Sequence, residues 1–269
     1  MRIRCGYTLT FDCAGATPLV LMLKVRPERE ADLLSIQNLG NDRGAAMRDY
    51  RDIYGNVCTR VLAPAGPITF TADFLIADSG QPDPTVVGLE QHAVEDLPDE
   101  TLLYLLPSRY CDTDRLSDLA WAEFGSTPPG GARVQAIVDY AHKRVEFGYP
   151  HASSARTAFG AHEDQKGVCR DFAHLAVTLC RCMNIPARYV TGFLGDIGIP
   201  PVDAPMDFSA WFEVFLEGRW RTVDARHNKP RIGRILQAVG RDAADVAIST
   251  QFGRAPLIRF EVVTDEVRG

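Results

Sequence analysis

Cys169 is the residue whose type and position most clearly indicate chemistry, because it opens a predicted helix. In the segment KGVCRDFAHLAVTLCRCM a Gly and a Val precede Cys169, and Cys169, Phe172 and Cys180 share one apolar helical face. The free N–H groups at a helix start stabilise a thiolate and supply donors for an oxyanion, and Arg170 is expected to strengthen the effect. The position indicates a nucleophile for acyl transfer, and a buried structural cysteine is the alternative.

Two further segments follow Cys169 in a fixed order. IPARYVTGF, which begins at Ile185, is a predicted strand, and SAWFEVFLEGRWRTVDAR contains a second strand, a hairpin and a strand that ends at Asp224. Together with Gly-x-Cys, these motifs resemble the transglutaminase-like superfamily, in particular its bacterial branch of transglutaminase-like cysteine proteases with an N-terminal β region. The resemblance covers about residues 155–230. It implies a cysteine-dependent hydrolase or acyltransferase that cleaves or transfers an amide or peptide acyl group through a thioester at Cys169.

The resemblance also implies a triad whose central member is missing. It makes Cys169 the nucleophile and Asp224 the residue that orients the base, but the position expected to hold the triad histidine is Ser209. If Glu217-Gly218 is a two-residue hairpin loop, Trp211 lies opposite Asp224 and Ser209 lies diagonal to it. Diagonal cross-strand neighbours are about 7–8 Å apart, so a histidine at this position would reach the carboxylate and a serine would not.

Other groups are candidates for the proton acceptor. His227 follows Asp224 by three residues and reaches it only if the strand ends or bulges there. His162, in the loop before Cys169, is a second candidate if the loop folds back over the thiol. Water acting on a thiolate held by Arg170 and the helix dipole is a third, and it predicts slow turnover because general-base help is worth about 10²–10⁴-fold.

Two functions from different classes follow. The first is a cysteine peptidase or amidase if water accepts the acyl group, or a transamidase if an amine does, with Arg170 and Trp211 as expected substrate contacts. The second is a catalytically impaired binding module, which Ser209 favours and the retention of Cys169 and Asp224 disfavours. An engineered His→Ser change made to trap an inactive form would leave the same serine.

The elements that must position these residues form an α+β pattern. Residues 1–80 contain short alternating strands and turns, which predict an N-terminal antiparallel β-sandwich domain. A Pro-, Gly- and Asp-rich stretch at 78–88 is typical of a linker, so the catalytic core is expected over 89–269. Helical patterns at 112–124 and 131–147 precede the cysteine helix and its strands. They predict a papain-like core of helices packed on an antiparallel sheet.

Composition narrows the function further. The chain has 269 residues and a net charge of −6 without a long basic run, so no nucleic acid or membrane partner is expected. The resemblance implies a peptide or protein amide as the substrate. Its seven cysteines are odd in number, include no CxxC, and show no zinc-ligand spacing, so no metal or other cofactor is expected. Reduced thiols and the absence of an apolar leader predict a cytoplasmic location. Nothing in the sequence predicts the oligomeric state.

Overall fold

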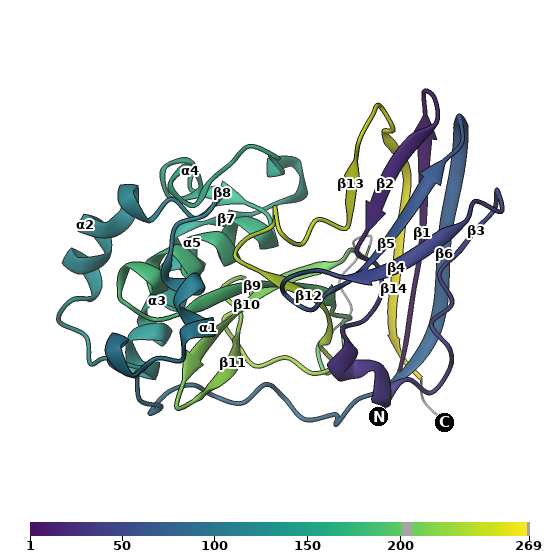
Figure 1. Cartoon of the computed structure of the whole chain (residues 1–269). Helices are drawn as coiled ribbons and strands as arrows, with labels where there is room; N and C mark the ends of the chain where they lie inside the picture. Colours follow the sequence, from purple (N-terminus) through teal and green to yellow (C-terminus); the bar gives the residue numbers. More distant parts are fainter. Residues whose placement is uncertain (201–205, 268–269) are drawn as a thin grey trace.

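The computed structural model describes residues 1–200 and 206–267, and it shows a β-sandwich beside a mixed helix and sheet core (Figure 1). The fold is therefore α+β with antiparallel sheets, as the sequence predicts. No helix in the described part of the chain is long and apolar enough to cross a membrane.

The sandwich consists of two four-stranded antiparallel sheets with the orders β14-β1-β6-β3 and β13-β2-β5-β4. Along β1 the residues that point inward, such as Ile3, Leu9 and Phe11, are fully buried, as expected where one face packs on a second sheet. The strands are β1 (Arg2–Cys13), β2 (Thr17–Leu21), β3 (Gly40–Asn41), β4 (Met47–Arg51), β5 (Val57–Ala63), β6 (Gly66–Ala77), β13 (Ser249–Gln251) and β14 (Leu257–Glu266), and a 3-10 turn η1 (Pro27–Asp32) lies between β2 and β3.

The sandwich takes strands from both ends of the chain. β13 pairs with β2, and β14 pairs with β1 from Ile3 opposite Glu266 to Phe11 opposite Leu257. The division expected from the sequence, at residues 80–89, places β13 and β14 in a different unit from the strands with which they pair. The short-range pattern did not reveal this, because backbone hydrogen bonds between distant segments decide which sheet a strand joins.

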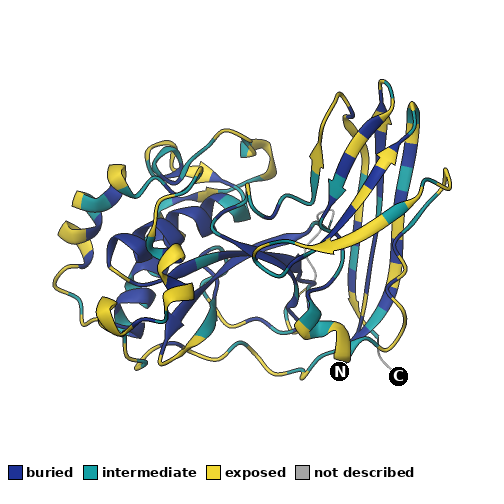
Figure 2. Ribbon diagram, in the orientation of Figure 1, coloured by how far each residue is buried: buried dark blue, intermediate teal, exposed yellow. Residues whose placement is uncertain are grey.

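The core surrounds one central helix, α5 (Cys169–Cys182), which lies between other helices and a sheet of order β11-β10-β9-β12. Every residue of α5 from Asp171 to Cys182 is buried (Figure 2). The elements are η2 (Val94–Asp96), α1 (Asp99–Leu102), η3 (Leu103–Leu105), α2 (Thr113–Phe124), α3 (Gly131–Arg144), β7 (Glu146–Phe147), η4 (Tyr149–His151), α4 (Ala158–Asp164), β8 (Lys166–Gly167), β9 (Ala187–Phe193), β10 (Ser209–Leu216), β11 (Arg219–Val223) and β12 (Ile235–Gly240).

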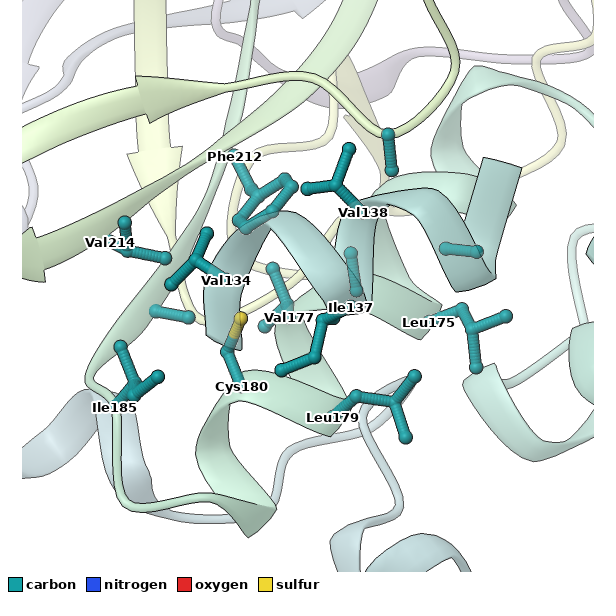
Figure 3. Packing of buried hydrophobic residues seen from close by; sticks show 14 of the residues in the cluster. Val134, Ile137, Val138, Leu175, Val177, Leu179, Cys180, Ile185, Phe212 and Val214 are labelled. Carbon is teal, nitrogen blue, oxygen red and sulfur yellow. The ribbon is translucent and has the colours of Figure 1, made fainter. Parts of the chain in front are cut away.

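Apolar packing fixes α5 on both sides. Figure 3 shows Val134 and Val138 of α3 and Phe212 of β10 gathered around Val177 of α5, and all four belong to one buried cluster. These buried side chains are closely packed, so α5 cannot shift without opening the core. The start of this helix is therefore held rigidly against the sheet.

The β10–β11 hairpin has the register that the sequence predicts. Leu216 pairs with Arg219 and Phe215 with Trp220. Glu217 and Gly218 form the two-residue loop with φ values of 49° and 75°, the left-handed geometry that matches the twist of a hairpin. The end of β11 is thereby placed beside the start of β10.

Candidate active site

The start of α5 is held by two hydrogen bonds between Val168 and Asp171, the residues on either side of the first helical turn at Cys169. The Val168 N–H donates to the Asp171 carboxylate at 2.8 Å, and Asp171 is buried with 1% exposure. A Cβ on Gly167 would lie 2.6 Å from the Asp171 Cβ, so only glycine fits at position 167. Asp171 thus caps the helix, as a first-turn acid is expected to do, and fixes Cys169 as its first residue.

Cys169 opens into a pocket of about 320 Å³, the size of a small-ligand site. It is the partly exposed cysteine, whereas the remaining six are buried. The pocket also contains Ser209 and His227, so the structure brings these three predicted residues to one cavity. The other lining residues are Phe147, Tyr149, Leu194, Asp196, Ile199, Met206, Asp207, Phe208, Arg226, Lys229 and Arg231.

His227 is hydrogen bonded to Asp224 through its ring. Nδ1 of His227 lies 2.8 Å from Oδ2 of Asp224, and the His227 backbone N–H donates to Oδ1 at 2.9 Å. This contact arises because β11 ends at Val223 and the chain then turns. An end or bulge of the strand at this point is what His227 was expected to need in order to reach Asp224. The carboxylate therefore fixes the imidazole orientation within the pocket.

A buried arginine also binds Asp224, at the same carboxylate oxygen that His227 Nδ1 contacts. Arg234 Nη2 donates to Asp224 Oδ2 at 2.7 Å, and its Nε donates to Asp83 Oδ2 at 2.7 Å. Asp83 also accepts the Arg231 backbone N–H at 3.0 Å, so the linker-like stretch is tied to the loop after Asp224. Neither Asp83 nor Arg234 was predicted as a site residue from the sequence, although the arginine-rich run that follows Asp224 was a signal for buried ion pairs.

This network sets the protonation of the His227–Asp224 pair. Burial would raise the pKa of the Asp224 carboxyl, but the Arg234 charge and the His227 hydrogen bonds outweigh it and hold that pKa far below the ordinary value. Burial lowers the pKa of His227, and the Asp224 carboxylate offsets this only in part. At neutral pH the pair is therefore a neutral imidazole on an ionised carboxylate.

The protonation of Cys169 differs from the expectation drawn from its helix position. Burial raises the pKa of the thiol to about 11, although the Arg226 charge and the backbone amides of Ala210 and Arg170 act in the opposite direction. Loss of hydration at the sulfur outweighs the helix dipole here. The expected thiolate is therefore wrong for the resting protein, in which Cys169 is a neutral thiol.

Arg170 and Trp211, the expected substrate contacts, do not line the Cys169 pocket. The Arg170 guanidinium is hydrogen bonded to the Ser153 carbonyl and stands over the Tyr110 ring at 5.5 Å. Trp211 has 2% exposure and packs in the sheet with the Arg234 guanidinium 5.0 Å above its ring. Both side chains are turned away from the pocket because each already contacts neighbouring groups: Arg170 contacts Ser153 and Tyr110, and Trp211 contacts Arg234.

Ser209 lines the pocket without joining the polar network. Its Oγ is buried and has no hydrogen-bond partner among the described residues. The Ser209 carbonyl accepts a bond from the Thr191 hydroxyl at 3.3 Å, and its backbone pairs opposite Gly192. The structure thus leaves an unused hydroxyl where the triad histidine is expected.

The remaining candidate histidine, His162, belongs to a different part of the core. Its Nδ1 lies 3.1 Å from the Tyr140 hydroxyl, and the two rings stack with centroids 6.1 Å apart. The loop before Cys169 forms α4 instead of folding over the thiol. His162 does not line the pocket, so His227 is the histidine that the fold brings to Cys169.

Comparisons with known proteins agree with this geometry. A family model described as the transglutaminase-like superfamily matches residues 120–225. An uncharacterized protein of Mycobacterium leprae is 28% identical over 216 residues, 75% of this chain and 75% of that protein. An uncharacterized protein of Mycobacterium tuberculosis is 29% identical over 221 residues, 73% of this chain and 68% of that protein.

One solved structure is similar over the whole chain. The crystal structure of a protein named as a putative cysteine protease from Cytophaga hutchinsonii is 29% identical, with a TM-score of 0.84 and coverage of 100% of this chain and 91% of that chain. The family match includes both Cys169 and Asp224. Residues 120–225 are therefore similar to the core of the transglutaminase-like superfamily, and the whole chain shares the fold of that bacterial protein.

Proposed function

We propose that the protein is a thiol-dependent amide hydrolase or acyltransferase that acts on a peptide or protein amide through Cys169. One observation carries this proposal: Cys169 and His227 line one pocket, and His227 is hydrogen bonded to a buried, ionised Asp224. A nucleophile, a base and a group that orients the base are the three parts that such chemistry requires.

The reaction begins with a proton transfer. With Nδ1–H donating to Asp224, Nε2 of His227 carries the lone pair that accepts the Cys169 proton. As the sulfur bonds to the acyl carbon, the carbonyl oxygen becomes an oxyanion that the Cys169 backbone N–H stabilises at the helix start. The amine leaves with the proton from His227, and a thioester remains on Cys169. Water or a second amine then attacks the thioester and restores the thiol.

The raised pKa of Cys169 determines how this step proceeds. A thiol with a pKa of about 11 is neutral at physiological pH, so His227 removes the proton during attack and no thiolate is formed beforehand. The reaction therefore depends strongly on the base, and water alone would be a poor substitute. Loss of His227 should cost about 10²–10⁴-fold in acylation rate.

Acylation by p-nitrophenyl acetate tests the proposal. The wild-type chain should release a burst of p-nitrophenol and carry the acetyl group on the peptide that contains Cys169. Cys169→Ala should abolish the burst, and His227→Ala should reduce its rate by about 10²–10⁴-fold. His162→Ala, which removes a histidine outside the pocket, is the matched control and should keep the wild-type rate. Equal rates for the two histidine variants would remove His227 from the mechanism.

Ser209 supports a second candidate function, a catalytically impaired module that retains the cleft for binding. The observation in its favour is the buried Ser209 hydroxyl, which has no hydrogen-bond partner among the described residues and lines the same pocket as a thiol that is neutral at rest. Ser209→His separates the two functions. If acylation of Cys169 appears only in this variant, the wild-type pocket binds without reacting, and the enzyme proposal fails.

A further inference from the structure

Three cationic side chains from one loop line the Cys169 pocket. In the loop that follows Asp224, Arg226, Lys229 and Arg231 all line this cavity. The protein as a whole has a net charge of −6, so this local cluster of positive charge is opposite in sign to the net charge of the chain. Such a cluster indicates an anionic group on the ligand.

The two arginines are held in place by the scaffold. Arg226 stacks on the Phe147 ring, with its guanidinium carbon 3.8 Å from the ring centroid. Arg231 has 3% exposure and donates through Nη2 to the Gly195 carbonyl at 2.8 Å, but its Nε is buried and unpartnered within the described residues. A buried guanidinium with an unused donor is costly unless a ligand completes its bonding.

Lys229 is the third cation and the one free to move. It is exposed, and it forms no hydrogen bond or ion pair within residues 1–200 and 206–267. A flexible ammonium at the edge of a pocket can close on an anion at little cost to the fold.

The charge balance of the pocket selects the kind of anion. Among the lining residues that the structure describes, three cations face two carboxylates, Asp196 and Asp207, and these five groups leave one net positive charge. The Cys169 thiol and the His227 imidazole are both neutral near pH 7 and change nothing in this balance. One excess positive charge matches a monoanion such as a carboxylate, whereas a phosphate dianion would be left half compensated.

We propose that the substrate of this pocket carries a carboxylate close to the reacting amide, bound by Lys229 together with Arg231. This inference rests on the proposed function, because it places the carboxylate beside an acyl group that Cys169 attacks. A cavity of about 320 Å³ holds a group the size of an amino-acid residue, so the substrate class is an amide of an acidic residue or of a carboxyl-terminal residue.

Two alkylating reagents of nearly equal size, iodoacetate and iodoacetamide, test this directly. Both modify the Cys169 thiol, but only iodoacetate carries a carboxylate. Rates at Cys169, measured by peptide mass at one mildly alkaline pH, give a ratio that is compared with the ratio for 2-mercaptoethanol. The ratio for Cys169 should be at least about threefold higher, as expected for a partly exposed ion pair.

Variants assign the effect to the pocket. Lys229→Gln should lower the ratio by about threefold, and Lys229→Glu should lower it further. Lys143→Gln, which removes an exposed charge on α3, is the matched control and should retain the wild-type ratio. A wild-type ratio equal to that of 2-mercaptoethanol, or equal ratios in the two Gln variants, overturns the carboxylate inference alone. Failure of both reagents to modify Cys169 overturns the proposed function and this inference with it.

Discussion

Replacing Arg234 by methionine should destabilise the protein more than almost any other single change near the pocket. Arg234 has 9% exposure and bridges Asp83 and Asp224 at 2.7 Å each. Methionine fills a similar volume but leaves the Asp224 carboxylate buried without its cation. Breaking a buried ion pair in this way costs about 3–5 kcal/mol.

The same magnitude can be expressed as a change in melting temperature. Unfolding entropy near 60 °C is about 2.1 cal/mol/K per residue, which for 269 residues gives about 0.56 kcal/mol/K. A loss of about 3–5 kcal/mol therefore lowers the melting temperature by about 5–9 °C.

The loss should also depend on pH with a definite sign. The folded pKa of Asp224 lies below its unfolded value, so its ion pair stabilises the protein above about pH 4 and stops doing so as pH falls through the folded pKa. The difference between Arg234→Met and the wild type should be full at about pH 7 and shrink below about pH 4.

Urea unfolding of four proteins measures these effects. They are the wild type, Arg234→Met, the double variant Arg234→Met/Asp224→Asn, and Arg219→Met, which changes an exposed arginine of the hairpin. The double variant should recover part of the stability because the buried Asp224 charge that lost its cation is gone, and the control should stay within about 0.5 kcal/mol of the wild type. If Arg234→Met is as stable as Arg219→Met, the buried network does not hold the Asp224 site together.

Three further predictions follow from the site. Burial raises the pKa of Asp207 to about 6, so the ionised carboxylate destabilises the fold at high pH. Asp207→Asn should therefore add about 2–3 kcal/mol to the free energy of urea unfolding at about pH 8, and it should add nothing below about pH 4. An equal gain at both pH values would contradict this. Gly167→Ala should cost about 1–3 kcal/mol in the same assay, because the added Cβ meets buried Asp171, and a change under about 0.5 kcal/mol would refute the close contact. Alkylation of Cys169 by iodoacetamide should rise about tenfold per pH unit until its pKa of about 11, and a plateau near neutral pH would show a preformed thiolate instead.

Local patterns were enough to predict the elements that carry the site. The start of α5 at Cys169 follows from the preceding Gly and Val and the apolar helical face that begins there, and the hairpin register follows from Glu217-Gly218 between two apolar runs. In each case the signal lies within a few residues, so alternation or helical periodicity reports it directly.

The features that could not be predicted depend on residues far apart in the chain. The Arg234 bond to Asp83 joins positions 151 apart, and no periodicity reports such a contact. The raised pKa of Cys169 comes from burial by several elements at once, whereas a sequence shows only the helix start and the neighbouring Arg170. His227 reaches Asp224 because β11 stops at Val223, and strand ends are set by tertiary pairing.

The pairing of β14 with β1 couples the stability of the sandwich to that of the Cys169 pocket. The segments that form the Cys169 pocket lie in sequence between β6 and β14, which are the two neighbours of β1 in one sheet. If the core unfolds, β14 is no longer held near β1, and the sheet loses an outer strand. A molecule bound beside Cys169 adds its binding free energy to the folded state of both parts. Such a molecule should therefore slow hydrogen exchange of backbone amides in β1, far from the site where it binds.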